Sequence, residues 1–236
     1  MRFWYLTAPI LLAASCSGGG DARPLKVYAA SSLAEVLPDL DGEALYQFAG
    51  SDDLALQLRE GAEADVFAAA SSQHPTSLHE AGVVDAPVVF ATNELVLIVP
   101  RTGVVDSVED LADPGVKLVI GAEGVPIGDY TRQLLKDLGS SAVLEQVVSE
   151  EEDVKGVLAK VRLGEADAGI VYATDAKPVE DEVVSIELPA EAQPVIEYMV
   201  AVVSGSAHVQ EAQAFIDRLL GSRGGKALRA AGFGVP

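Results

Sequence analysis

The chain has 236 residues, of which 36 are acidic and 16 basic, so its formal net charge is −20. Apolar residues make up 49% of the sequence, which is too many for a disordered chain and enough to build one large domain or two small lobes. So acidic a surface repels a polyanion, and nucleic acid is therefore excluded as an expected partner. The single cysteine excludes a disulfide framework and a multi-cysteine zinc site.

The N-terminus has the features of a secretion signal. Arg2 precedes an apolar run that extends to Ser15, and Cys16 follows immediately. We therefore expect residues 1–15 to be a signal peptide and residues 16–24 to hold a flexible polar tether. The sequence Leu-Ala-Ala-Ser-Cys before the tether resembles a bacterial lipoprotein lipobox, although alanine stands at the third position before the cut, where leucine is usual. The resemblance implies a lipidated Cys16 that anchors a soluble body to a membrane. An ordinary signal peptide with an incidental cysteine is the alternative.

The rest of the chain alternates short apolar runs with amphipathic segments. The runs are apolar on both faces, which is typical of central strands in a covered, largely parallel sheet. We expect these strands at residues 25–29, 64–68, 95–99, 117–121, 168–172 and 198–203. Helical spacing of apolar residues predicts helices near 54–61, 134–139, 154–164 and 212–220, and the first three end at a glycine. This alternation predicts an α/β fold.

Four expected turns lead from a strand into a helix through small or capping residues. They span residues 29–32, 48–51, 124–128 and 149–153. Helix N-termini carry unpaired N–H groups and a partial positive charge. Two such turns from each half of the chain, facing one crevice, would form an anion site without a basic side chain. Each turn alone has a plainer interpretation, in which Ser32, Ser51 and Asp153 cap helices, Tyr172 edges the core and Gly128 is a flexible turn.

Eight short segments occur in an order that resembles one known family. They read VYAASSL at 27–33, FAGS at 48–51, GAEADVFA at 61–68, NELVL at 93–97, VPIGDY at 125–130, EDVK at 152–155, GIVYATDA at 169–176 and AGF at 231–233. Together they look like the periplasmic molybdate-binding proteins of ABC importers, which are type II solute-binding proteins. The resemblance extends from about Leu25 to the end of the chain.

The resemblance implies a two-lobed, Venus-flytrap fold in which each lobe is a mixed, largely parallel sheet flanked by helices. Lobe 1 is expected to comprise residues 25–90 and 198–236, and lobe 2 residues 91–197. The chain would then cross between the lobes near 89–93 and 197–199. Closure of the lobes around a ligand is the expected motion.

The resemblance also assigns a binding site for a tetrahedral oxyanion, molybdate or tungstate. Ser32 and Ser51 would donate from their hydroxyl and backbone N–H groups, Ile127 and Val154 from their backbone N–H groups, and Tyr172 from its phenol. No cofactor, catalytic residue or metal site beyond the bound oxyanion is implied. The expected protein is a monomer on the periplasmic or extracytoplasmic face of a membrane, which delivers its ligand to an ABC permease with a separate ATPase chain.

Three residues depart from the family pattern. Asp52 and Asp53 follow Ser51, where relatives usually carry small neutral residues or a single polar one, and a carboxylate beside a dianion would weaken binding. We expect both side chains to point outward. Met199 stands where relatives often have proline, which alters the expected stiffness of the hinge.

Other functions remain open at this point. The protein could bind another anion, such as sulfate or phosphate, or act as a surface receptor lobe without affinity for small anions. A hydrolase is less favoured, because there is no Gly-x-Ser-x-Gly elbow and none of the three histidines lies in a motif that resembles an active site. A metal site at His74 and His79 is not expected, because their five-residue spacing does not place both rings on one helical face. We also expect Pro75 to disfavour one helix running through both histidines.

Overall fold

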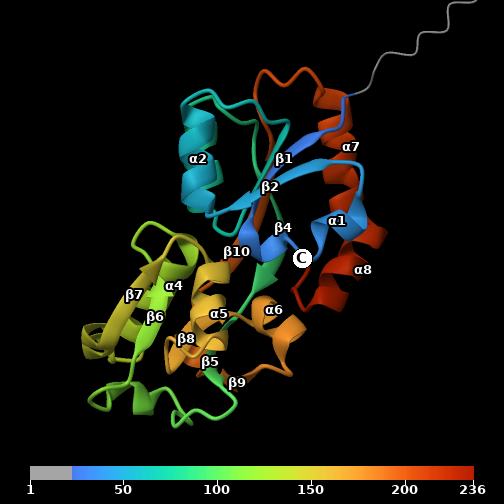
Figure 1. Cartoon of the computed structure of the whole chain (residues 1–236). Coiled ribbons are helices and arrows are strands. Elements are labelled where there is room, and N and C mark those ends of the chain that lie inside the picture. The colour runs from blue at the N-terminus through green and yellow to red at the C-terminus, as the bar shows by residue number, and fades with distance from the viewer. Residues whose placement is uncertain (1–22) are drawn as a thin grey trace, which may run out of the picture.

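A computed structural model describes residues 23–236 and shows two lobes stacked along the long axis of the molecule (Figure 1). The predicted signal peptide and the predicted lipidation at Cys16 lie outside the described residues. Each lobe contains one five-stranded sheet, and helices cover both sheets. The α/β class and the two-lobed architecture expected from the sequence are confirmed.

The first sheet has the strand order β2-β1-β3-β10-β4. Strands β2, β1 and β3 run parallel, whereas β10 is antiparallel to both of its neighbours, β3 and β4. The strands span Lys26–Ala30 (β1), Leu45–Ala49 (β2), Val66–Ala69 (β3), Val88–Asn93 (β4) and Ile196–Val202 (β10).

The second sheet repeats this plan, with the order β7-β6-β8-β5-β9. Strands β7, β6 and β8 run parallel, and β5 is antiparallel to β8 and β9. The strands span Leu95–Pro100 (β5), Leu118–Gly121 (β6), Val147–Glu151 (β7), Ala168–Tyr172 (β8) and Val183–Glu187 (β9).

The reversed strand of each sheet is the one that follows a passage between lobes. The chain leaves the first sheet at Asn93, the last residue of β4, and enters the second at Leu95. It leaves the second sheet at Glu187 and re-enters the first at Ile196. Strand β10 has an irregular register at Tyr198 and Met199, close to this re-entry. The division into residues 25–90 with 198–236 and residues 91–197 stays a prediction.

Helices pack on both faces of the first sheet. Helix α2 (Ser51–Arg59) and α3 (Gln73–Glu80) cover one face, where Leu54, Leu58 and Leu78 meet Phe67 in a separate apolar cluster. On the other side lie α1 (Leu37–Leu40), α7 (Val209–Leu220) and α8 (Ser222–Ala231) (Figure 1). In the second lobe, α4 (Pro126–Asp137) and α5 (Val154–Arg162) pack on the sheet, and α6 (Ala173–Ala176) follows β8.

All six predicted strands and all four predicted helices are present. Most ends shift by a few residues, but the helix predicted near 134–139 spans Pro126–Asp137 and so begins eight residues earlier. The predicted glycine stops at Gly61, Gly139 and Gly164 adopt positive φ angles of 92°, 70° and 70°, which is the left-handed conformation that ends a helix at low cost for glycine. The four strands that the sequence did not indicate, β2, β4, β7 and β9, are the four edge strands.

The expectation that Pro75 separates His74 from His79 is wrong. Helix α3 begins at Gln73 and runs through both histidines, with Pro75 as its third residue. Proline fits there because the N–H groups of the first helical turn have no partner within the helix in any case. In the described part of the chain, no three His, Cys, Asp or Glu side chains gather in a way that could hold a metal ion.

Residues 23–236 also contain no helix with the length and apolarity needed to cross a membrane.

Candidate functional site

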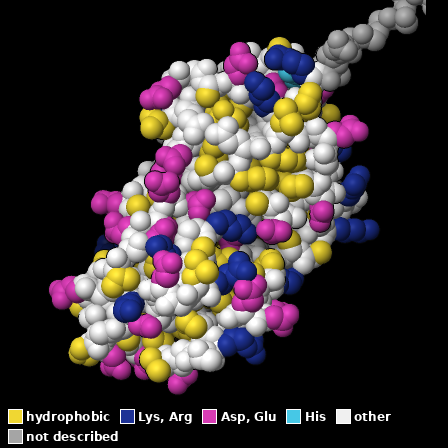
Figure 2. Space-filling view, in the orientation of Figure 1, with side chains coloured by type: hydrophobic (Ala, Val, Ile, Leu, Met, Phe, Trp, Pro, Cys, Tyr) yellow, Lys and Arg dark blue, Asp and Glu magenta, His cyan; other side chains and the backbone are white. Residues whose placement is uncertain are grey.

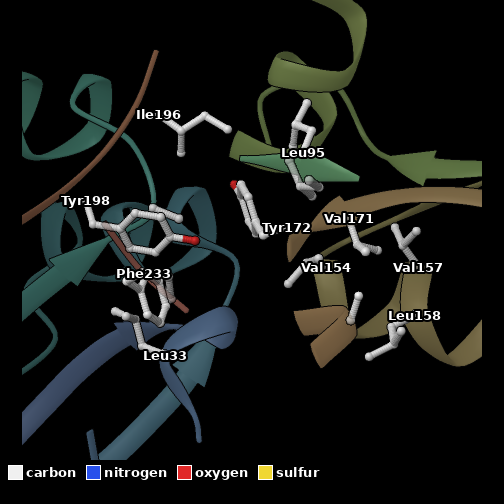
Figure 3. Close-up of a cluster of buried hydrophobic side chains, with 14 of the residues drawn as sticks. Leu33, Leu95, Val154, Val157, Leu158, Val171, Tyr172, Ile196, Tyr198 and Phe233 are labelled. Carbon is white, nitrogen blue, oxygen red and sulfur yellow. The ribbon is translucent and has the colours of Figure 1, made fainter. Parts of the chain in front are cut away.

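A small pocket lies between the two lobes, and all five residues of the predicted site line it. They are Ser32, Ser51, Ile127, Val154 and Tyr172. Ser32 and Ser51 come from the first lobe, and the other three from the second. Figure 3 shows the apolar surroundings, in which Tyr172 and Tyr198 face each other between Leu33 and Phe233 on one side and Val154 and Val171 on the other.

The four turns singled out in the sequence converge on this pocket. A short 3-10 helix at Ser31–Leu33 and helices α2, α4 and α5 all begin at it. The first-turn N–H groups of these helices have no acceptor within their own helix. Their convergence concentrates N–H donors and positive helix ends at one place between the lobes.

The interpretation of Ser32 and Ser51 as N-caps is wrong. The N-cap residues are Ala30 and Gly50, so both serines lie inside the first turn. Asp153, in contrast, caps α5 as expected, because its Oδ1 accepts a 2.9 Å hydrogen bond from the N–H of Gly156. The two serine hydroxyls are therefore available for other partners.

The Ser51 hydroxyl is held by a backbone group. Its Oγ accepts a 3.0 Å hydrogen bond from the N–H of Ala70, which follows strand β3. Ser51 is 2% exposed, so its hydroxyl lies in a fixed, largely dry environment. Because Oγ is used as an acceptor here, the hydroxyl hydrogen remains to be donated into the pocket.

The Ser32 hydroxyl is the end of a longer hydrogen-bonded chain. Its Oγ lies 2.9 Å from the Tyr198 hydroxyl, and Asn93 Nδ2 donates to that same hydroxyl at 3.3 Å. The side chain of Asn93 is fixed by the N–H of Glu94, which donates to Asn93 Oδ1, and by Nδ2 donating to Thr174 Oγ1. Tyr198 accepts from Asn93, and either hydroxyl of the Ser32–Tyr198 pair can be the donor to the other. When Tyr198 donates, the Ser32 hydrogen is left for the pocket.

The Tyr172 hydroxyl is a buried group without a hydrogen-bond partner in the described structure. Its side chain is 1% exposed, and its ring centroid lies 5.8 Å from that of Tyr198. Burial raises the pKa of Tyr172 and of Tyr198 well above the ordinary value, so both phenols keep their protons. An unpartnered buried donor costs stability, and a ligand that accepts from it recovers that cost.

Close packing of glycines positions the Ile127 turn. A Cβ atom added at Gly128 would lie 2.1 Å from the carbonyl oxygen of Ala122 and 2.3 Å from that of Gly121. Gly128 is therefore not a flexible turn, as the sequence allowed, but the residue that lets α4 approach the end of β6. This approach places the first turn of α4, with Ile127, at the pocket.

Most charged side chains near the pocket lie outside its wall. Among the described residues that line the pocket, none is basic, and the one acidic side chain, Asp153, is occupied by its cap hydrogen bond. Behind it, Lys155 Nζ lies 3.1 Å from Asp175 Oδ1 and 3.6 Å from Glu35 Oε1, so Lys155 links the lobes. Burial raises the pKa of Asp175 to about 6, although Lys155 opposes the shift.

Asp52 is half-buried and not fully exposed, contrary to the expectation that it points outward. Its Oδ1 is buried and has no hydrogen-bond partner in the described structure. Burial raises the pKa of Asp52 above the usual value, and its neighbour Asp53 contributes in the same direction. Asp52 does not appear among the residues of the pocket wall, so its carboxylate lies beside the site rather than in it.

Asn93 and Tyr198 are site residues that the sequence did not single out for function. Asn93 lies in one of the segments that resemble the family, and Tyr198 lies in a predicted strand. The sequence therefore indicates where each residue lies in the fold but not which residues each one hydrogen-bonds. They belong to β4 and β10, which pair across 105 positions of sequence. A hydrogen bond over that separation becomes visible when the sheet is known.

The chain belongs to the family of bacterial extracellular solute-binding proteins, whose family model matches residues 25–234. The molybdate-binding protein ModA of Mycobacterium tuberculosis is 35% identical over 230 residues, which cover 91% of this chain and 86% of that protein. The putative ABC transporter substrate-binding lipoprotein YvgL of Bacillus subtilis is 29% identical, with 97% and 95% covered. Among solved structures, the periplasmic molybdate-binding protein of Azotobacter vinelandii matches with a TM-score of 0.81 at 23% identity, with 90% of this chain and 99% of that chain covered.

Proposed function

We propose that this solute-binding protein captures molybdate or tungstate between its lobes and delivers it to an ABC importer. The observation that carries the proposal is the convergence of five neutral donors on one pocket, among them the unpartnered hydroxyl of Tyr172. The 35% identity to a molybdate-binding protein over most of both chains supports the same ligand.

The chemistry of the pocket favours an oxyanion that carries no proton. Ser51 has one hydrogen left to donate, and so has Ser32 when Tyr198 donates to it. Tyr172 is protonated, and the first-turn amides of Ile127 and Val154 are donors. Molybdate, tungstate and sulfate accept hydrogen bonds at every oxygen at neutral pH. Phosphate carries a proton there and needs an acceptor in return. Hydrogen bonds to a charged ligand are stronger than neutral ones, so five neutral donors hold a dianion without a basic side chain.

A panel of anions tests the ligand. A ligand that binds the folded state alone raises the melting temperature with its concentration. We expect molybdate and tungstate to raise the melting temperature of this protein at micromolar levels, and sulfate and phosphate at equal concentrations to leave it unchanged. No shift with any of the four contradicts the proposal and favours the alternative of a surface receptor lobe. If only sulfate or phosphate shifts the melting temperature, the proposed ligand is wrong but the anion-binding function stands.

The partner we propose is a membrane permease of the ABC class with a separate ATPase chain. The protein acts as a carrier of its ligand and not as a catalyst, as the family name implies.

We further propose that it is monomeric and that lipidated Cys16 holds it at the extracytoplasmic face of a membrane. The anchor has its own test, because Cys16→Ser is expected to release the protein from the membrane fraction. Retention of the variant in membranes contradicts the anchor without touching the binding proposal.

A further inference from the structure

We infer that Gly50 sets how far the binding cleft closes. Because Gly50 has no side chain, the two lobes approach closely enough to enclose a small oxyanion, and we call this contact the closure stop. A Cβ atom added at Gly50 would lie 2.6 Å from the carbonyl oxygen of Glu152. Gly50 belongs to the first lobe and Glu152 to the second, so this contact crosses the cleft beside the pocket. The inference rests on the proposed function.

The backbone conformation of Gly50 does not itself require glycine. Its φ of −57° and ψ of 141° are open to any residue, so alanine fits this turn when the first lobe is considered alone. The added atom would also lie 2.7 Å from Asp52 Oδ1, but that is the flexible end of a side chain in the same lobe, which can rotate away. The contact that cannot relax in this way is the one with the Glu152 backbone.

Neither turn is free to move back within its own lobe. On the first lobe, Gly50 follows Ala49, which pairs with Ala30 in the sheet, and the Gly50 carbonyl accepts from the N–H of Leu54 at 3.1 Å. The turn is further held by the hydrogen bond from Ala70 to Ser51 Oγ.

On the second lobe, Glu152 is fixed on both sides. The carbonyl of Glu151 accepts from the N–H of Ala122 at 2.9 Å, and Asp153 caps α5. A methyl group at position 50 therefore displaces one whole lobe against the other by at least a few tenths of an ångström. Because Ser51 and Val154 lie next to the contact on opposite lobes, this displacement lengthens the hydrogen bonds of any anion held between them.

The expected effect falls on the closed, ligand-bound state. Ligand enters an open cleft, so the association rate depends little on this contact, whereas the dissociation rate depends on how completely the lobes close. Gly50→Ala should therefore speed dissociation. It should not lower the melting temperature of the ligand-free protein, because alanine suits the local backbone and reduces the freedom of the unfolded chain.

The experiment compares wild type, Gly50→Ala, Gly50→Val and the control Gly42→Ala in the full-length chain in detergent. Gly42 is an exposed glycine of the same lobe, and an added Cβ there meets nothing nearer than 3.5 Å. Affinity and rates are measured for molybdate, tungstate, sulfate and phosphate. We expect at least a tenfold loss of affinity in Gly50→Ala, a larger loss in Gly50→Val, faster dissociation in proportion, and no change in Gly42→Ala.

The possible failures are distinguishable. If wild type binds sulfate or phosphate but not molybdate, the proposed ligand fails, and the closure stop is judged on the anion that binds. Binding by Gly50→Ala within twofold of wild type overturns the closure stop while the proposed function stands. An equal loss in Gly42→Ala, or a loss that appears in the association rate, overturns it as well. If wild type binds none of the four anions, both proposals fall.

Discussion

The Ser32 Oγ and the Tyr198 hydroxyl lie 2.9 Å apart, and Asn93 Nδ2 donates to the same Tyr198 hydroxyl at 3.3 Å. Asn93 directs its Nδ2 at Tyr198 because its Oδ1 is occupied by the N–H of Glu94. When Tyr198 donates to Ser32, the Ser32 hydrogen is left for the pocket. The same Asn93 donates to Thr174 in α6 of the second lobe, so its orientation depends on contacts in both lobes.

Replacing Tyr198 by phenylalanine should weaken anion binding even though Tyr198 does not line the pocket. Without its hydroxyl, the Ser32 hydrogen turns toward whatever acceptor is available, and Asn93 loses one acceptor. We expect an affinity for molybdate roughly tenfold lower, equivalent to about 1.5 kcal/mol. Tyr46→Phe is the matched control, because the Tyr46 hydroxyl donates to the carbonyls of Leu37 and Asp41 away from the site. Titration calorimetry measures the affinity of both variants for molybdate. Equal affinities of Tyr198→Phe and Tyr46→Phe would disprove the role of Tyr198.

Ser51→Ala and Tyr172→Phe should both weaken binding but differ in stability. Each removes one hydrogen bond to a charged ligand, worth about 1.5–3 kcal/mol. Ser51→Ala also leaves the N–H of Ala70 without its acceptor, so the ligand-free protein should be less stable. Tyr172→Phe removes a hydroxyl that has no partner in the described structure, so ligand-free stability should hold or rise. Chemical denaturation without ligand separates the two, and a destabilised Tyr172→Phe contradicts this account.

Asp52→Asn should strengthen anion binding. The Asp52 carboxylate has a buried oxygen beside the cleft, and its negative charge opposes a dianion across little water. We expect a severalfold gain in affinity at low ionic strength that shrinks as salt is added. Asp53→Asn, the next residue along α2, is the control for net charge. If both variants gain equally, the effect belongs to the overall charge of the protein and not to the position of Asp52.

The buried carboxyl of Asp175 should make stability fall as the pH rises. Its pKa is about 6 in the folded protein and 3.8 ordinarily, so between these values the folded state holds a proton that the unfolded state has lost. The free energy of unfolding therefore decreases across this window, by an amount on the order of 1–3 kcal/mol. Asp175→Asn should match wild type near pH 4 and exceed it in melting temperature at pH 7.5. The exposed Asp217→Asn should follow wild type throughout, and parallel melting curves for all three contradict the assignment.

The central strands could be predicted from the sequence and the edge strands could not, for one physical reason. Val66–Ala69 is buried along its whole length, so it appears as an unbroken apolar run. Val147–Glu151 is an edge strand with no fully buried residue, and its sequence, Val-Val-Ser-Glu-Glu, is more than half polar and forms no continuous apolar run. It forms a strand because it pairs with β6, and the local sequence does not show which segment a strand will pair with.

The site divides in the same way. Four of its five predicted residues lie on or next to turns whose small residues are visible in the sequence, and the fifth, Tyr172, ends a predicted strand. The structure brings all five to one pocket. The contributions of Tyr198, Gly50 and Asp52 depend on neighbours from distant strands or from the opposite lobe. Asp52 was expected to face solvent because a carboxylate close to a bound dianion would weaken binding. In the structure its side chain is half-buried, and its Oδ1 is buried next to Gly50.

Titration calorimetry of the protein with molybdate, in the presence of a large excess of sulfate, tests the central claim most directly. If the donors between the lobes form a site for molybdate, one equivalent binds tightly and the excess sulfate leaves its affinity unchanged. If molybdate gives no heat, or if sulfate displaces it, the pocket is not a selective molybdate site and the proposed function is contradicted.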